Sequence, residues 1–327
     1  MDARLEREDK PRLVAVGAAV QDVFLSGSIL TPQYDDGHWE EQFRLGDKYE
    51  LENITFSTGG GATNAAVTFA RQGLHSVFMG KIGEDVAGRA VLDDLHSETV
   101  DTSLVKQDGD TQTGYSVILL APNGERTILT YRGASQTFGL EDFDLSNMQA
   151  EWLYISSLAG HMEVLEELVQ AAKSKDMKIA INPGKGELAQ ADWFKSILRQ
   201  VDVLALNKEE IQQLVEGQDD RQLVRHASDM VSTTVMTDGP RGVVATDRRQ
   251  IIQAGMYEDV PVIDRSGAGD AFVSGLVAYL AAGRELAEAI KFASANSTSV
   301  VNQIGAKAGI LDNDAVLHDM PMEITEF

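Results

Sequence analysis

Short apolar runs alternate along this chain with longer stretches in which apolar residues recur every three or four positions. The first run, residues 13–17, ends in glycine and has the pattern of a buried strand. Five similar runs follow, at residues 76–79, 152–155, 178–182, 201–206 and 234–237. Helices are expected over residues 63–72, 86–95, 163–174 and 208–216. This alternation predicts an α/β fold with a mainly parallel sheet, helices on both faces and a ligand site at the carboxyl ends of the strands.

Two segments break this rhythm and predict a second, smaller sheet. Residues 39–56 are rich in aromatic and acidic residues, and the alternation around Tyr49 and Leu51 is typical of a half-exposed strand. Residues 115–120 and 126–131 flank Asn123-Gly124, which is a two-residue hairpin signal because both residues tolerate positive φ.

We assign the smaller sheet to a lid made from about residues 33–57 and 111–133. The lid and the α/β pattern together form one domain, residues 13–327, preceded by a charged N-terminal tail, residues 1–12. An exposed, partly apolar strand edge calls for cover, so the lid predicts a homodimer.

Composition narrows the function classes. The chain has 28 Lys and Arg against 51 Asp and Glu, a net charge of −23, which opposes broad contact with nucleic acid or anionic membranes. It has no cysteine, which excludes disulfides and a cysteine nucleophile, and its six histidines form no metal-binding pattern. The N-terminus lacks the apolar core of a secretory signal, and the uncharged run 271–283 is too short to span a membrane. We expect a cytoplasmic protein.

Two glycine-rich clusters each run into a predicted helix. The first, Gly59-Gly60-Gly61, is followed by Asn64, so a ligand could approach the backbone beside an amide side chain. An ordinary turn into a helix gives the same pattern. The second cluster, Gly267-Ala268-Gly269, exposes successive N–H groups suited to an anion, with Asp270 in the first helical turn. An acid there also compensates the helix dipole.

In kind and order, these clusters resemble those of the ribokinase-like (PfkB) carbohydrate kinase family, over residues 14–311. The resemblance also takes in Thr113-Gly114, Asn182-Pro183, Asn207 with Glu210, and Thr237 with Gly239 and Gly242. It implies a three-layer α/β/α, doubly wound fold with a β lid. It also implies transfer of the ATP γ-phosphoryl group to a primary hydroxyl with the help of Mg²⁺.

The resemblance assigns the chemical step to the second cluster. Asp270 corresponds to the general base that accepts the hydroxyl proton, and the backbone N–H groups of Gly267, Ala268 and Gly269 correspond to an anion hole for the phosphoryl oxygens. The chain carries no Gly-x-x-x-x-Gly-Lys-Ser/Thr loop, so the other common phosphate cradle is absent from the sequence.

The resemblance places ATP and its metal near the later motifs. Asn207 and Glu210 match positions that arrange Mg²⁺ and the phosphates, although the same spacing is a capping box for the helix that follows. Residues implied for the nucleotide itself are Thr237, Gly239, Gly242 and Ser294, the last near the adenine.

On the acceptor side, Asp22 matches the position that holds sugar hydroxyls, together with Gly60, Gly61 and Asn64. Arg132, just after the lid hairpin, is expected to bind an acceptor oxygen or a phosphate through its planar guanidinium; a solvated strand end is the alternative. Relatives build a monovalent-cation loop near the positions of Asp264 and Gly305, which implies K⁺ as a further ion.

Two departures from the family pattern leave the acceptor open. Arg265 replaces the usual threonine of the late motif, and residues 156–160 read Ser-Ser-Leu-Ala-Gly where ribokinases carry a glutamate on the sugar. A sugar kinase acting on a pentose, ketose or related compound is the first hypothesis, and a nucleoside kinase of the same family is the second. A binding protein without catalysis is a third. A dinucleotide oxidoreductase is disfavoured because residues 16–19 lack G-x-G-x-x-G.

Overall fold

The computed structural model describes residues 10–123 and 125–327. Most of the predicted N-terminal tail (residues 1–9) and Gly124 of the predicted hairpin turn therefore lie outside the described residues.

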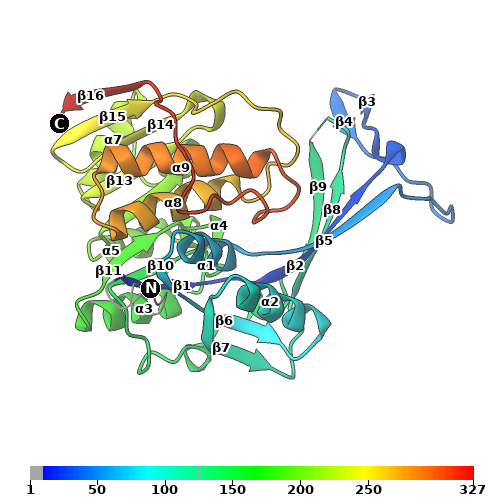
Figure 1. Cartoon of the computed structure of the whole chain (residues 1–327), viewed down its shortest axis with the longest axis horizontal. Coiled ribbons are helices and arrows are strands. Elements are labelled where there is room, and N and C mark those ends of the chain that lie inside the picture. Colours follow the sequence, from blue (N-terminus) through cyan, green and yellow to red (C-terminus); the bar gives the residue numbers. More distant parts are fainter. Residues whose placement is uncertain (1–9, 124) are drawn as a thin grey trace.

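A central sheet dominates the fold (Figure 1). Its order is β16-β15-β14-β13-β12-β11-β10-β1-β6-β7. The parallel strands are β1 (Arg12–Val16), β6 (His75–Gly83), β7 (Asp101–Asp108), β10 (Trp152–Ile155), β11 (Lys178–Ile181), β12 (Val203–Asn207) and β13 (Thr233–Thr237). Three antiparallel strands extend one edge: β14 (Val243–Thr246), β15 (Gln250–Ala254) and β16 (Met322–Glu326). The apolar runs predicted these parallel strands, β7 excepted, because a strand buried on both faces is apolar throughout.

The chain moves outward from β1 in two directions, first to β6 and β7 and later to β10 and beyond. This makes the gap between the carboxyl ends of β1 and β10 a topological switch point, where open α/β sheets bind ligands. Val16 pairs with Ile155 at that end, and a Cβ on Gly17 would collide with the Ser156 side chain. The next residues of both strands therefore pack closely together.

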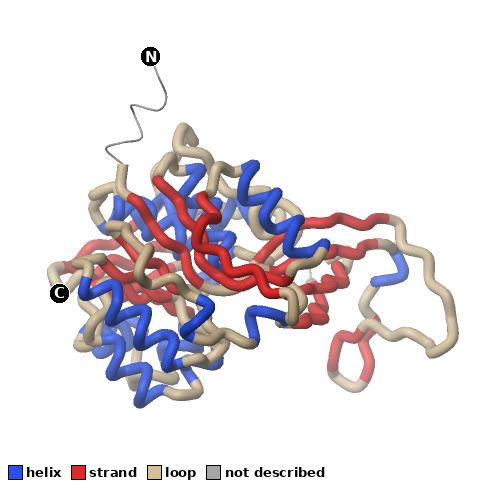
Figure 2. The backbone as a smooth tube through the Cα atoms, turned by 90° about the horizontal axis from the view of Figure 1, so that it is seen from below, coloured by secondary structure: helices blue, strands red, loops and turns tan. Residues whose placement is uncertain are grey.

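Helices cover both faces of the sheet, as Figure 2 shows. One hydrophobic cluster lies under α1 (Gly61–Arg71), α2 (Val86–Ser97), α8 (Ala268–Ala281) and α9 (Leu286–Val301). A second cluster lies under α3 (Met162–Ser174), α5 (Ala191–Leu198) and α7 (Asp220–Ser228), with short helices α4 (Lys185–Leu188) and α6 (Lys208–Ile211) between strands. The predicted three-layer α/β/α fold is confirmed.

A second sheet projects from this body and is called the lid sheet here (Figure 1, right). Its strand order is β5 (Asn53–Gly59), β2 (Val20–Ser26), β8 (Gly114–Leu120) and β9 (Arg126–Tyr131). A small hairpin, β3 (Gln33–Asp35) with β4 (His38–Glu40), lies beyond it. The predicted small sheet is therefore present, and its strands at 115–120 and 126–131 are found nearly as expected.

Two local predictions were wrong. The segment around Tyr49 is a loop rather than a strand, and the Tyr49 hydroxyl accepts a hydrogen bond from the Arg44 backbone at 2.8 Å. The helix expected over 208–216 ends at Ile211, because the N–H groups of Gln213 and Leu214 bond to carbonyls three residues back and tighten the backbone. No helix in the described ranges is both long and apolar enough to cross a membrane.

Candidate active site

The N-termini of two helices from opposite ends of the chain meet at the switch point. Asn64, in the first turn of α1, donates from Nδ2 to Oδ2 of Asp270 in the first turn of α8 at 2.8 Å. A Cβ on Gly61 would lie 3.3 Å from the other Asp270 oxygen, Oδ1. The structure thus brings together the two glycine clusters, which lie about 200 positions apart in the sequence.

Asp270 has one engaged oxygen and one that faces the first glycine cluster. Burial raises the pKa of its carboxyl above the ordinary value, and the hydrogen bond from Asn64 opposes that rise. Among the described residues, Oδ1 of Asn64 is buried without a hydrogen-bond partner, so this amide can still accept a proton donor. A carboxylate with a raised pKa and a free oxygen is suited to accept a proton from a bound hydroxyl.

The first glycine cluster makes room for the side chains around it. A Cβ on Gly59 would collide with the carboxylate of Asp22, and a Cβ on Gly60 would collide with the Ala18 carbonyl. Gly60 also has a φ of 101°, which L side chains rarely adopt. The cluster is therefore more than a turn into a helix, because its missing side chains let Asp22 lie against the backbone.

Asp22 lies in β2 and not on an exposed loop. In the register of the lid sheet, Asp22 pairs with Ser57 of β5 and with Ser116 of β8. Burial raises the pKa of Asp22 to about 6, a hydrogen bond with Ser116 lowers it, and the nearby Asp264 and Asp270 carboxylates raise it further. Asp22 therefore belongs to the same charged neighbourhood as Asp270.

The second cluster forms a loop with the geometry of an anion site. Gly267 is left-handed at φ 76°, and a Cβ there would collide with Ala306. The first N–H groups of α8, a helix of 14 residues, have no acceptor within the helix. The hydroxyl of Ser266 is buried and has no hydrogen-bond partner in the described part of the chain. Gly269 faces open space.

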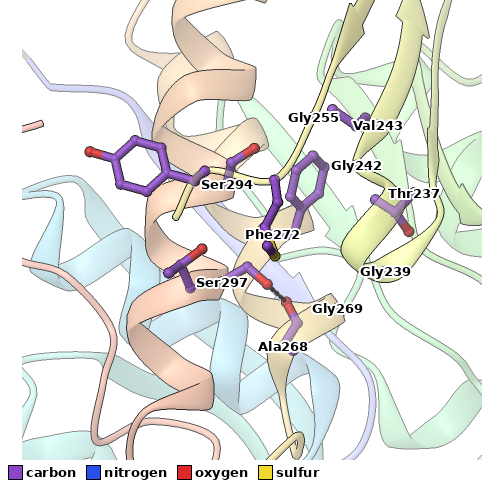
Figure 3. Close-up of a pocket in the computed structure, with 13 residues that line it drawn as sticks. Thr237, Gly239, Gly242, Val243, Gly255, Ala268, Gly269, Phe272, Ser294 and Ser297 are labelled. Atoms are coloured by element: carbon purple, nitrogen blue, oxygen red, sulfur yellow. Dashed lines mark hydrogen bonds between the residues drawn. The ribbon is translucent and has the colours of Figure 1, made fainter. Parts of the chain in front are cut away.

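A pocket of about 160 Å³ adjoins this loop (Figure 3). Ala268 and Gly269 lie at one end of it, and apolar side chains such as Phe272 and Val243 form part of its wall. The four residues predicted for the nucleotide all line this pocket: Thr237, Gly239, Gly242 and Ser294. Gly242 has a φ of 95°, and a Cβ there would collide with the Ala254 carbonyl, so the bend of the chain requires glycine.

Asn207 and Glu210 form the capping box. Oδ1 of Asn207 accepts from the Glu210 N–H at 2.9 Å, and Oε2 of Glu210 accepts from the Asn207 N–H at 2.8 Å. Neither residue lines the pocket described above, but Asn207 pairs in the sheet with Thr237, which does. Burial raises the pKa of Glu210.

Asp264 and Gly305 are also brought together. The Gly305 N–H donates to Oδ2 of Asp264 at 3.0 Å, the Ser266 N–H donates to Oδ1 at 2.9 Å, and the Arg126 guanidinium of the lid lies 3.9 Å from Oδ1. The side chain of Arg265 points to the lid, with Nε 3.9 Å from Oε1 of Glu125.

Arg132 directly follows β9 at the base of the lid sheet. It is exposed at the end of β9, and its backbone lies beside Gly114 at the base of the lid sheet. Within the described ranges, no hydrogen bond or ion pair links its side chain to another residue.

Sequence reasoning missed Lys307, which lies buried against β5 and α2. Its Nζ donates to Oγ1 of Thr58 at 2.6 Å and to Oδ2 of Asp94 at 2.8 Å. A lone lysine outside any motif is normally read as solvated, so only the fold could reveal this contact.

Comparison with known proteins agrees with this arrangement. The model of the pfkB family of carbohydrate kinases matches residues 27–313. A probable fructokinase of Arabidopsis thaliana is 30% identical over 283 residues, which is 79% of this chain and 82% of that protein. The chain therefore belongs to the pfkB carbohydrate kinase family, as predicted. It is a phosphotransferase that acts on an alcohol group, a sugar or nucleoside kinase of this family, and ATP use goes with that membership.

Two solved structures show the same fold at lower identity. Arabidopsis thaliana ribokinase complexed with ribose and ATP has a TM-score of 0.75 and 20% identity, and the match covers 93% of this chain and 96% of that one. A nucleoside kinase of Methanocaldococcus jannaschii also has a TM-score of 0.75, with 18% identity and coverage of 92% and 94%. The fold therefore does not separate sugar from nucleoside as the acceptor.

Proposed function

We propose that this protein is a cytoplasmic, ATP-dependent sugar kinase that transfers the γ-phosphoryl group to a primary hydroxyl of a pentose, ketose or related sugar. The observation that carries the proposal is the position of Asp270. Its carboxylate contacts Asn64 of the first glycine cluster, and the residue directly before it, Gly269, lines the nucleotide pocket. A base between an acceptor side and a donor side is what direct phosphoryl transfer requires.

The acceptor would bind between the lid sheet and the first glycine cluster. Asp22 would accept hydrogen bonds from sugar hydroxyls, with the backbone of Gly60 and Gly61 at close range and Asn64 as a further polar contact. Arg132, at the base of the lid, would reach an acceptor oxygen when the sugar is bound.

The chemical step would proceed between Asp270 and the anion loop. The acceptor hydroxyl gives its proton to Oδ1 of Asp270 as its oxygen bonds to the γ-phosphorus, and the bond from that phosphorus to the bridging oxygen breaks to release ADP. The backbone N–H groups of Gly267, Ala268 and Gly269 stabilise the charge on the transferring phosphoryl oxygens.

Thr237, Gly239, Gly242 and Ser294 would hold the nucleotide in the 160 Å³ pocket. Asn207 and Glu210 would arrange Mg²⁺ and the phosphates, and Mg²⁺ neutralises phosphate charge when bound. The capping box leaves Oε1 of Glu210 for the ion or its water, and it leaves the Asn207 amide nitrogen, which is a donor and cannot bind a cation, to donate to a phosphate oxygen. A single carboxylate suits an ion held mostly by water and phosphates.

A monovalent cation fits less well. Both oxygens of Asp264 already accept backbone N–H bonds, one of them from Gly305, and Arg126 adds a positive charge 3.9 Å away. In this proposal K⁺ therefore takes no part in the chemical step, and any bound K⁺ would lie in the loop beside Asp264.

A nucleoside kinase is the second candidate. Residues 156–160 favour it, because they lack the glutamate that ribokinases place on the sugar. The apolar residue of that segment, Leu158, gives no further support to nucleoside binding. Leu158 is fully buried in the cluster under α3, so it offers no surface to a nucleobase. We therefore keep a sugar as the acceptor.

An acceptor screen tests the proposal. The purified protein is given ATP and Mg²⁺ with ribose, fructose, 2-keto-3-deoxygluconate, adenosine or cytidine, and ADP release is measured. Turnover of a sugar and not of a nucleoside supports the proposal. Preference for adenosine or cytidine assigns the second candidate, and ADP release that is independent of every acceptor would overturn kinase activity on this panel.

A further inference from the structure

Residues 311–321, called the C-terminal segment here, lie beside the pocket proposed for the nucleotide. β15 and β16 are antiparallel, and Ala254 at the end of β15 pairs with Met322 at the start of β16. The chain that leaves β15 and the chain that enters β16 therefore meet at the same edge of the sheet. Residues 255–257, which leave β15, line the pocket, and the C-terminal segment enters β16.

Two contacts join the C-terminal segment to Tyr257. The rings of Tyr257 and His318 are stacked, with their centroids 4.0 Å apart and an angle of 20° between their planes. The His318 backbone N–H donates to the Tyr257 hydroxyl at 2.8 Å. The stack holds the plane of the Tyr257 ring and the hydrogen bond holds its outer end, so the ring has little freedom to rotate.

The two residues that follow His318 anchor it in turn. Oδ1 of Asp319 lies 2.6 Å from Nζ of Lys291 on α9. Met320 is only 8% exposed and belongs to the hydrophobic cluster under α8 and α9. His318 is therefore fixed to the body of the protein, although its own side chain is half exposed.

Tyr257 separates His318 from the nucleotide pocket. His318 lines a second pocket, of about 260 Å³, together with Leu317. Among the described residues, Tyr257 and Thr298 are the two that line both this pocket and the nucleotide pocket. An aromatic ring in the wall between them offers a flat apolar surface, which suits the flat ring of a nucleobase.

Tyr257 lies on the α9 side of the nucleotide pocket. It shares the second pocket with Ala295 and Thr298 of α9, and Ala295 directly follows Ser294, the residue predicted near the adenine. Residues 268–269 of the anion loop lie at the other end of the nucleotide pocket from Ser294 (Figure 3). A nucleotide with its phosphates at the anion loop would therefore bring its base towards Tyr257.

We propose that Tyr257 binds the base of the phosphoryl-donor nucleotide and that His318 is a positioning residue that holds the Tyr257 ring for it. The C-terminal segment thereby becomes part of the nucleotide site. The inference rests on the proposed function in taking the 160 Å³ pocket as that site. A ring already held by His318 loses little freedom when a base stacks on it, so binding is offset less by the cost of ordering.

The test is the affinity for ADP in the presence of Mg²⁺, measured by calorimetry, which requires no acceptor. Tyr257→Ala removes the ring, whereas Tyr257→Phe keeps the ring and removes the hydroxyl. His318→Ala removes the stacking partner, and His318→Phe replaces it with another ring. The matched control is His96→Ala, which removes an exposed histidine bonded to Thr102. Melting temperatures verify that each variant is folded.

Tyr257→Ala should raise the Kd for ADP about tenfold or more, which is the loss expected for one stacked base. His318→Ala should raise it about threefold to tenfold, because the ring is present but no longer held. Tyr257→Phe, His318→Phe and His96→Ala should stay within about twofold of the parent, because each leaves a held ring in the wall. An unchanged Kd in Tyr257→Ala or in His318→Ala overturns the inference. If Tyr257→Ala does not fold, His318→Ala and its rescue by His318→Phe decide.

A comparison of ADP with CDP separates contact with the base from a merely structural role. A purine offers a larger surface for stacking than a pyrimidine, so the loss of affinity in Tyr257→Ala should be larger for ADP than for CDP. A structural defect would weaken both nucleotides alike, and an equal loss therefore overturns the role of Tyr257.

Ser294→Leu distinguishes failure of this inference from failure of the proposed site. The substitution puts a larger apolar side chain into the nucleotide pocket from α9 and leaves the C-terminal segment unchanged. If Ser294→Leu weakens ADP binding but the Tyr257 and His318 variants do not, the inference alone fails. If Ser294→Leu binds ADP as the parent does, the assignment of the pocket to the nucleotide fails and the inference falls with it.

Discussion

The two faces of the lid sheet differ sharply in what they present. Asp22 and Phe24 lie on one face, where Asp22 belongs to the charged neighbourhood of Asp270 and a Cβ on Gly305 would lie 3.7 Å from the Phe24 ring. The other face carries Phe56 and Leu129, which are 64% and 59% exposed. The inner face is completed by the rest of the same chain. The outer face is covered only in part, because Val23 in β2 is 5% exposed whereas Phe56 and Leu129 on the two edge strands are not covered.

The α/β body has no such asymmetry, because each face of its sheet is covered by helices and a buried cluster. We therefore expect the body to carry the stability and the base, and the lid sheet to contribute one face to the acceptor site and the other to association. The predictions below test this division, beginning with the largest expected effect.

The strongest test of the body is Asp270→Asn. The amide is nearly isosteric but cannot accept a proton, so kcat should fall about 10²–10⁴-fold, as is typical for loss of a general base. The KM for ATP and the melting temperature should change little, because the anion loop and the packing of α8 remain. Steady-state kinetics and a thermal melt of this one variant suffice.

Asn64→Ala is the matched control, since it removes the hydrogen bond to Asp270 and keeps the base. Its kcat should fall less than that of Asp270→Asn. A kcat within threefold of the parent for Asp270→Asn would exclude Asp270 as the base.

The body was predictable from sequence for a physical reason. A strand buried on both faces must be apolar throughout, so β1, β10 and β12 stood out as apolar runs. Local motifs also placed Asp270 and Asn64, because a glycine cluster entering a helix is visible in a short window of sequence. The contact between Asn64 and Asp270 joins positions 206 residues apart, so no short window of sequence could predict it.

The lid sheet was harder to predict because its strands face different surroundings. β2 was missed: its sequence Val-Gln-Asp-Val-Phe-Leu-Ser mixes polar side chains and an acid with apolar residues and shows no clean alternation. Lys307 was missed for a related reason, since its burial depends on Thr58 and Asp94, more than 200 positions away. Tertiary contact, rather than local pattern, decides both cases.

The second prediction concerns the base of the lid sheet. If Arg132 binds an acceptor oxygen, Arg132→Ala should raise the acceptor KM about tenfold or more, which corresponds to the loss of a charged hydrogen bond. The KM for ATP should stay unchanged, because Arg132 is not among the residues that line the pocket proposed for the nucleotide. The control is Arg44→Ala, which removes an exposed arginine from the loop between β4 and β5. Equal effects on both substrates would reject the acceptor role.

The third prediction tests the outer face of the lid sheet. The register places Phe56, Val23, Val117 and Leu129 in one row across β5, β2, β8 and β9. We propose that a second copy of the chain covers the exposed members of this row, Phe56 and Leu129, in a homodimer. Sedimentation should then show a dimer at micromolar concentration for the parent. A monomeric parent would contradict the proposal.

The double variant Phe56→Asp with Leu129→Asp should sediment as a monomer, because it buries two charges if the dimer forms. Its kcat should remain that of the parent, since the row faces away from Asp22. A matched substitution on the small hairpin, Tyr34→Asp, lies outside the row and should leave the dimer intact. Loss of activity together with the dimer would show that the two faces are coupled.

The smallest expected effect is on stability, and it distinguishes the two roles considered for Asn207, helix cap and Mg²⁺ site. As the cap of α6, its Oδ1 accepts from the Glu210 N–H at 2.9 Å, so Asn207→Ala should lower the free energy of unfolding by about 1 kcal/mol. Asn207→Ser can still cap and should retain most of that stability, but its shorter side chain lacks the amide. If Asn207 also orders Mg²⁺ and phosphate, both variants should raise the Mg²⁺ concentration needed for half-maximal turnover. A change in stability without any change in Mg²⁺ dependence would leave Asn207 as a helix cap alone.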